Sequence, residues 1–236
     1  FLGLAGGLLA GGLSQSALFG QDPQWTKPVH RVANAALSAQ KAAPATPASS
    51  AKAALVRGLE MARQSLTRSK TEVRDYTAVL VKRERIGETV GEHEYMQIKV
   101  RNRKEENGRL VQPFSVYLAF VKPTSVKGRE VIYVENQNNG NIVAHEGGFK
   151  GRFLPTVSIP PTGMLAMRGQ RYPMTEIGVE NMILKLIERG EKALQFEDVH
   201  AELRNGARFQ NRACTLLRLT QPTRRPDAEF HKAEVY

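Results

Sequence analysis

The sequence is poor in cysteine and tryptophan, with one residue of each among 236. The single cysteine, Cys214, cannot close an internal disulfide and cannot supply a cysteine-based zinc site. It lies in an apolar run, which favours a buried small side chain over a reactive thiol. The apolar fraction of 41% and the charged fraction of 24% are ordinary for a globular protein, which excludes disorder along the whole chain.

Acidic residues are also few relative to basic ones, since 34 Lys and Arg stand against 23 Asp and Glu. The resulting net charge of +11 attracts anionic surfaces such as lipid head groups or acidic polymers. A nucleic-acid-binding protein usually clusters its cations with exposed aromatic residues or in a recognition helix, whereas here the cations are mixed with acids along the chain, as in residues 82–85 and 104–106. We therefore expect no nucleic-acid binding, and we interpret the charge as a solvated basic surface that can meet an anionic envelope surface.

Residues 1–20 contain no charged residue, and their apolar stretch carries six glycines. A short apolar core followed by small residues such as Ser14 and Ser16 predicts a secretory signal peptide. The chain begins with Phe1, so we expect a clipped start. The alternative, a retained membrane anchor, needs about 20 apolar residues, and the stretch ends near Leu13. We predict an exported protein of the periplasm or cell envelope.

Residues 21–51 combine four prolines with Ala, Ser, Thr and Gln. This composition buries too little apolar surface to offset the entropy lost on ordering, which predicts a disordered linker. The folded part is then a single domain over residues 52–236.

Hydrophobic periodicity predicts two helices and two groups of strands in that domain. The helices are expected at residues 52–68 and 179–194. The strands are expected at residues 76–85, 94–101, 114–121, 130–135 and 142–145, and then at 198–204, 208–221 and 229–236. Asn139-Gly140 and Asn205-Gly206 supply residues that accept positive φ in tight turns.

Residues 147–173 break this rhythm with five Gly and four Pro in 27 residues, yet they are rich in Phe, Met and Leu. Long irregular segments inside a domain are uncommon and often functional. The order of helix, meander, irregular segment, helix and meander predicts an α+β fold with helices on one face of a large antiparallel sheet. The chain ends within its last strand, so we expect C-terminal strands to be missing.

Five motifs follow one another along the chain: Tyr76–Arg85, Gly128–Glu135, Ala144–Gly151, Leu154–Val157 and Arg171–Gly178. In this fixed order they resemble the exported bacterial domain-of-unknown-function family 1571 over about residues 55–236. The resemblance implies an exported protein without a known reaction, and further strands beyond Tyr236.

The order of elements is also similar to the superfamily of the outer-membrane lipoprotein carrier and lipoprotein-sorting proteins. That resemblance implies a strongly curved antiparallel sheet, an open half-barrel, with helices and a loop on its concave side and an apolar cavity for acyl chains. Residues 147–173 are then a candidate lid, or alternatively their side chains simply complete a closed core. The candidate ligand-binding residues are Phe149, Phe153, Leu154, Met164, Met167, Arg152 and Arg168.

Signals for catalysis are weak in this sequence. His145 and Glu146 are candidates for a base and its partner, but adjacent residues of a strand point to opposite faces. The chain has no Gly-x-Ser-x-Gly motif, and its five histidines have no helical ligand spacing. We expect neither a metal nor a cofactor.

Three hypotheses follow from these observations. The first is a non-enzymatic envelope protein that binds a lipid, an acyl chain or a lipoprotein in an apolar cavity. The second is an interaction or sensor module that binds protein or an anionic polymer through its basic surface. The third is a hydrolase that uses His145 or Glu146.

Overall fold

The computed structural model describes residues 2–5, 48–223, 225 and 230–236. Within them the chain forms two compact units. The large-sheet unit holds residues 2–5 and 70–181, and the three-strand unit holds the described residues of 48–69 and 182–236. Residues 6–47, with most of the predicted signal peptide and linker, lie outside the described residues, so both remain predictions.

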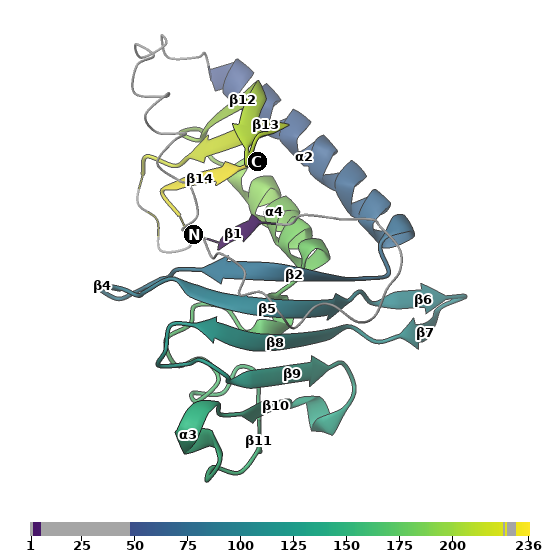
Figure 1. Cartoon of the computed structure of the whole chain (residues 1–236). Helices are drawn as coiled ribbons and strands as arrows, with labels where there is room; N and C mark the ends of the chain where they lie inside the picture. The colour runs from purple at the N-terminus through teal and green to yellow at the C-terminus, as the bar shows by residue number, and fades with distance from the viewer. Residues whose placement is uncertain (1, 6–47, 224, 226–229) are drawn as a thin grey trace. The chain divides into compact units, whose positions relative to one another are not determined.

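A seven-stranded antiparallel sheet forms the large-sheet unit, in the order β1-β2-β5-β8-β9-β10-β11. Figure 1 shows β2, β5, β8, β9 and β10 side by side. Two short hairpins, β3–β4 and β6–β7, leave the ends of β2 and β5. The strands are β1 Leu2–Ala5, β2 Asp75–Lys82, β3 Arg85–Ile86, β4 Thr89–Val90, β5 Glu94–Arg101, β6 Lys104–Glu106, β7 Arg109–Gln112, β8 Ser115–Lys122, β9 Glu130–Val134, β10 Ile142–His145 and β11 Val157–Ile159.

One face of this sheet is buried, as the alternation of apolar and polar residues predicts. In β5, Met96, Ile98 and Val100 are buried, while Gln97 and Lys99 between them are exposed. The core continues across the neighbouring strands through Leu80, Val116, Leu118, Phe120, Val131 and Ile142. The large-sheet unit contains one short α-helix, α3 Gly148–Gly151, and two 3-10 turns, η1 Asn138–Gly140 and η2 Met174–Glu176.

Two helices and three strands form the three-strand unit. They are α2 Ala48–Glu72, α4 Val179–Ala193, β12 His200–Phe209, β13 Arg212–Thr220 and β14 Lys232–Val235, except that residues 70–72 of α2 and 179–181 of α4 are counted with the large-sheet unit. Leu55 and Leu59 of α2 share a buried cluster with Ala201 and Leu219 of the sheet. No described helix combines the length and apolarity that crossing a membrane requires.

The predicted α+β class with a large antiparallel sheet is confirmed, and the sheet is not closed into a barrel. The C-terminal strands form a sheet of their own, and one half-barrel domain over residues 52–236 remains a prediction. Helix α2 begins at Ala48, inside the segment predicted as linker. β5 and β10 have the predicted bounds.

The turn predicted at Asn205-Gly206 is wrong. The register of β12 against β13 shifts between Arg204 and Ala207, so the two residues form a β-bulge in which Gly206 has a φ of +73°. The hairpin turn lies instead at Gln210 and Asn211, both with positive φ. Asn139-Gly140 does make the predicted turn, with φ of +55° and +78°.

The outer face of the large sheet carries a pair between neighbouring strands. The hydroxyl of Tyr117 on β8 donates a hydrogen bond to Glu130 Oε1 on β9 at 2.6 Å. Since the carboxylate accepts a hydrogen bond that only the neutral phenol can donate, ionisation of the phenol is opposed, and this hydrogen bond raises the pKa of Tyr117 to about 12.

We predict that ultraviolet titration of the folded protein detects a tyrosine that ionises near pH 12, and that Tyr117→Phe removes this step. The pKa is raised in the folded state, so the pair stabilises the fold fully below about pH 10 and loses this effect as the pH rises toward 12. Glu130→Gln is the matched variant and should return the step toward pH 10. An unchanged titration in Tyr117→Phe would contradict the assignment.

Candidate functional site

An apolar cavity of about 390 Å³ lies inside the three-strand unit, between its two helices and its sheet. This size falls in the range of about 300–1,000 Å³ that is typical of small-molecule pockets. Most of the lining is aliphatic, and only three of the side chains carry a hydroxyl group. The lining residues are Gly58, Met61, Ala62 and Ser65 of α2, Met182, Ile183 and Leu186 of α4, and Leu203, Thr215, Leu217, Val235 and Tyr236 of the sheet and its C-terminal end.

Two glycines allow the helices to pack closely around this cavity. A Cβ atom on Gly190 of α4 would lie 2.6 Å from Leu59 Cδ2 of α2. A Cβ atom on Gly58 of α2 would lie 2.9 Å from Leu217 Cδ2 of β13. Glycine inside a helix costs about 0.5–1 kcal/mol relative to alanine, and here it allows each neighbouring leucine to reach the helix backbone.

The three strands supply the floor of the cavity as one cross-strand row. Leu203, Leu217 and Val235 are register partners on β12, β13 and β14, and all three line the cavity. The adjacent row of Glu202, Arg218 and Glu234 belongs to the opposite face, since successive side chains of a strand alternate.

The polar row holds the strands together by charge. Arg218 Nε lies 2.9 Å from Glu234 Oε1, and its Nη1 lies 3.1 Å from Glu202 Oε2. Burial opposes ionisation of Glu234, but hydrogen bonds from Lys232 and Arg218 outweigh it, so the pKa of this carboxyl is lowered. The strands below the cavity are therefore paired by side chains as well as by backbone.

A second, polar cavity of about 460 Å³ adjoins the apolar one in the same unit. The two cavities share Met61, Leu203 and Thr215 as lining residues. The rest of the polar cavity is lined by Arg57, Glu60, Gln64 and Asn205. An apolar space beside a space lined by a cation, a carboxylate and two carboxamides has the layout expected for an amphiphilic ligand.

The residues predicted to bind a ligand lie elsewhere, in the large-sheet unit. The side chains of Phe149, Phe153 and Met164 are 76%, 75% and 89% exposed. Leu154, Arg152 and Arg168 are exposed as well, and Met167 is half-buried. The rings of Phe149 and Phe153 contact each other edge to face, with centroids 5.5 Å apart. None of the seven residues lines the two cavities described above, so their contact with a ligand remains a prediction.

Some residues of segment 147–173, and two residues just after it, pack onto the apolar face of the large sheet. Met174 is part of the buried core, and Ile159, Ala166 and Ile177 pack against it. The segment therefore covers the apolar face of the sheet with these side chains, as the alternative of a completed core expects, while its largest apolar side chains point to solvent.

Buried charges attach the end of this segment to β2. Lys82, only 8% exposed, donates to Gln170 Oε1 at 3.1 Å and pairs with Glu94 at 3.1 Å. The backbone N–H of Arg171 donates to Glu84 Oε2 at 3.0 Å. The expectation that residues 82–85 are solvated is wrong for Lys82 and Glu84, which are each 8% exposed. The signal in the sequence is that Lys82 continues the alternation of β2, whose last three residues are buried, half-buried and buried.

His145 and Glu146 have separate partners. His145 Nδ1 lies 3.2 Å from Thr156 Oγ1, whereas Glu146 pairs with Arg129 at 2.9 Å. A Cβ atom on Gly147 would lie 2.0 Å from the carbonyl carbon of Gly128. Gly147 is thus required by close backbone packing, and the pair does not have the mutual geometry of a base and its orienting group.

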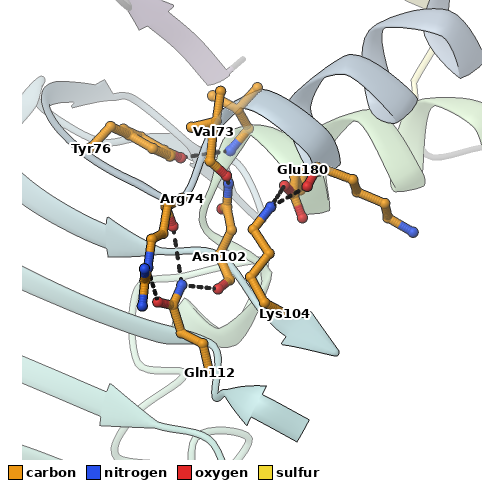
Figure 2. Close-up of polar contacts among 9 residues, drawn as sticks. Val73, Arg74, Tyr76, Asn102, Lys104, Gln112 and Glu180 are labelled. Atoms are coloured by element: carbon orange, nitrogen blue, oxygen red, sulfur yellow. Dashed lines mark hydrogen bonds and ion pairs between the residues drawn. The ribbon is translucent and has the colours of Figure 1, made fainter. Parts of the chain in front are cut away.

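Figure 2 shows a polar cluster in which side chains bind backbone groups of the large-sheet unit. Gln112 Nε2 donates to Asn102 O at 2.7 Å and to Arg74 O at 3.2 Å, and its Oε1 accepts from Arg74 Nε at 2.8 Å. Asn102, 2% exposed, donates from Nδ2 to Val73 O at 3.1 Å. These contacts join the chain entering β2 to the ends of β5 and β7, so the cluster is structural.

The same region holds the N-terminus of α4. The hydroxyl oxygen of Tyr76 on β2 accepts a hydrogen bond from the Val179 N–H at 2.8 Å (Figure 2), which satisfies one of the free amides of the first turn. Burial raises the pKa of Tyr76 above its ordinary value. Glu180 lies in the same turn, where a negative charge interacts favourably with the helix dipole, and Lys104 lies 4.0 Å from it.

The possible metal ligands of the described residues are dispersed. Among these residues, no three His, Cys, Asp or Glu side chains lie close enough together to hold a metal ion. Cys214 is half-buried, and its Sγ donates to the Ala207 carbonyl at 3.3 Å.

Residues 73–236 match the family described as protein of unknown function (DUF1571). The chain belongs to the DUF1571 family. The match covers all of the large sheet except β1, together with α4 and the three-stranded sheet. The resemblance found from the sequence motifs is confirmed at this level, and the DUF1571 family name assigns no activity to the chain.

A crystal structure of a DUF1329 family protein from Desulfovibrio piger ATCC 29098 is similar to this DUF1571 chain with 10% identity and a TM-score of 0.37. The alignment covers 71% of this chain and 61% of that protein. No curated protein matches the chain.

We predict that Gln112→Ala lowers the free energy of unfolding of this DUF1571 protein by about 1–3 kcal/mol, because it leaves buried backbone carbonyls and Arg74 without their partner. Urea unfolding measures the change. Gln97→Ala, at an exposed position of β5, is the matched control and should change stability by about 0.5 kcal/mol or less. Equal stability of the two variants would contradict the structural role of the cluster.

Proposed function

We propose that this protein is an exported cell-envelope protein that binds a single-chain amphiphile, such as a fatty acid or the acyl chain of a lipid, without acting as an enzyme. The observation that carries the proposal is the apolar cavity of about 390 Å³ between α2, α4 and the three-stranded sheet. Export is supported by the uncharged, glycine-rich apolar stretch of residues 1–20.

The chemistry of the cavity favours an acyl chain over a polar metabolite. Ser65, Thr215 and Tyr236 are the only lining residues with polar side chains, so a sugar or nucleotide would leave most of its polar groups unpaired. A methylene group moved from water into such a space gains about 0.8 kcal/mol, before the costs of immobilising the ligand. A chain of several methylene groups therefore gains enough to be retained.

The adjoining polar cavity would set the orientation of an amphiphile bound in the apolar cavity. An acyl chain in the apolar cavity would place its head group among Arg57, Gln64 and Asn205, next to the shared residue Thr215. Arg57 is a cation that can pair with a carboxylate or phosphate head group, and Glu60 is the one anion in the same lining.

We predict that Leu186→Trp abolishes binding of cis-parinaric acid, a fluorescent fatty acid, because the larger side chain fills the apolar cavity. Leu184→Trp is the matched control on the same helix. Leu184 is exposed and does not line the cavity, so this variant should bind as the unaltered protein does. Fluorescence titration gives the dissociation constants, and circular dichroism verifies that both variants are folded.

The outcome separates the proposal from its alternatives. Loss of binding of at least tenfold in Leu186→Trp alone supports the cavity as the site. Equal binding by the two variants, or no binding by the unaltered protein, overturns it and shifts attention to protein or polymer partners.

We also predict that Arg57→Gln weakens binding of a fatty acid about two- to fivefold, as expected for an exposed ion pair worth about 0.5–1 kcal/mol, and leaves the matching fatty alcohol unaffected. Competition against cis-parinaric acid measures both ligands. Arg68→Gln, at an exposed position of α2 that lines neither cavity, is the control. Equal weakening of acid and alcohol would show that Arg57 acts on the fold and not on the head group.

A further inference from the structure

The segment from Gly147 to Thr175 contains four basic residues, Lys150, Arg152, Arg168 and Arg171, and no acidic residue. Residues 23–59 and 203–226 are also basic and free of acids, but the stretch from 147 to 175 combines this charge with a high content of Phe, Met and Leu. An acid-free basic segment is attracted to surfaces of high negative charge and repelled by basic ones.

Large apolar side chains stand exposed in the same segment. Phe149 and Phe153 are each about three-quarters exposed, and Leu154 beside them is 47% exposed. Met164 and Leu165 further along are 89% and 71% exposed. Apolar residues that are exposed together, as the contacting rings of Phe149 and Phe153 are, mark an interaction site more often than scattered single residues do.

The fold holds these side chains outward instead of drawing them into the core. Gly147 packs backbone to backbone against Gly128, and at the far end of the segment Gln170 is bound to Lys82 of β2 and Arg171 to Glu84 just after it. Between these points Ile159 and Ala166 fill the contact with the sheet. The core of the large-sheet unit is therefore filled by other side chains, and Phe149 and Phe153 are not part of it.

We infer that residues 149–154, with the exposed Met164, Leu165 and Arg168, dock the protein on an anionic lipid bilayer. Apolar rings that insert below the head groups, with arginines at the level of the phosphates, are the arrangement by which proteins attach to such a surface. Four basic residues without an acid among them favour an anionic partner, and an anionic bilayer offers negative charge over the whole area that such a segment covers.

The test uses a fluorescent reporter in the segment itself. In the full chain carrying Cys214→Ser, an NBD label is attached at Leu154→Cys, and in a matched control at Val111→Cys. Val111 is an apolar residue of β7 with 51% exposure. Vesicles of phosphatidylglycerol and phosphatidylcholine, and vesicles of phosphatidylcholine alone, are then added.

We expect NBD emission at position 154 to rise and shift to the blue with the anionic vesicles, and to be quenched by doxyl-labelled lipid, while the label at position 111 does not respond. The double substitution Phe149→Ser and Phe153→Ser should raise the lipid concentration at half-saturation at least tenfold. Arg152→Gln with Arg168→Gln should abolish the preference for anionic over neutral vesicles.

A label at position 154 that does not respond to vesicles overturns the proposal and makes the segment a site for a protein partner. A response to neutral vesicles as large as the response to anionic vesicles overturns the role of Arg152 and Arg168. The inference does not depend on acyl binding in the cavity, since Leu186→Trp should leave the response of the label unchanged. Failure of one proposal is therefore distinguishable from failure of the other.

Discussion

Close packing at two glycines is the constraint on which the candidate ligand site depends. Leu59 reaches the backbone of α4 at Gly190, and Leu217 reaches the backbone of α2 at Gly58. Through these two contacts α2 packs against both α4 and strand β13 of the three-stranded sheet. The side chains around Gly58 then leave a cavity that is lined mainly by aliphatic groups and is not filled by the protein. A larger residue at either glycine would separate the elements, because side-chain packing in a protein interior leaves little spare volume.

The large-sheet unit is stabilised in a different way, since its buried polar groups bind backbone and not ligand. Gln112 and Asn102 satisfy carbonyl groups where the chain enters and leaves the sheet, and Lys82 fixes the end of the irregular segment. Buried polar groups of this kind must be paired, and pairing them specifies one arrangement of the loops. The irregular segment is attached at Gly147 and at Gln170, on either side of Phe149 and Phe153, and the rings of these two phenylalanines stay exposed.

Much of the fold could be predicted from the sequence, while the site could not. Strict alternation fixed β5 at its exact bounds, and helical periodicity located α4 within one residue. The bulge at Gly206 was missed because Asn-Gly serves equally in a hairpin turn and in a bulge, and only the pairing of β12 with β13 distinguishes them. The cavity was missed because Leu186 and Leu217 have the same local pattern as residues that pack against each other.

The sequence by itself determined the α+β class, the family, the basic charge and the unusual composition of residues 147–173, since these depend on residue type and on order along the chain. Tertiary structure alone decided which apolar side chains of that segment became core and which stayed in water. It also decided that an apolar cavity lies among residues as distant in sequence as Ala62 and Val235. The physical reason is that burial and empty volume are properties of how elements pack together, and a periodic pattern records only which face of each element is apolar.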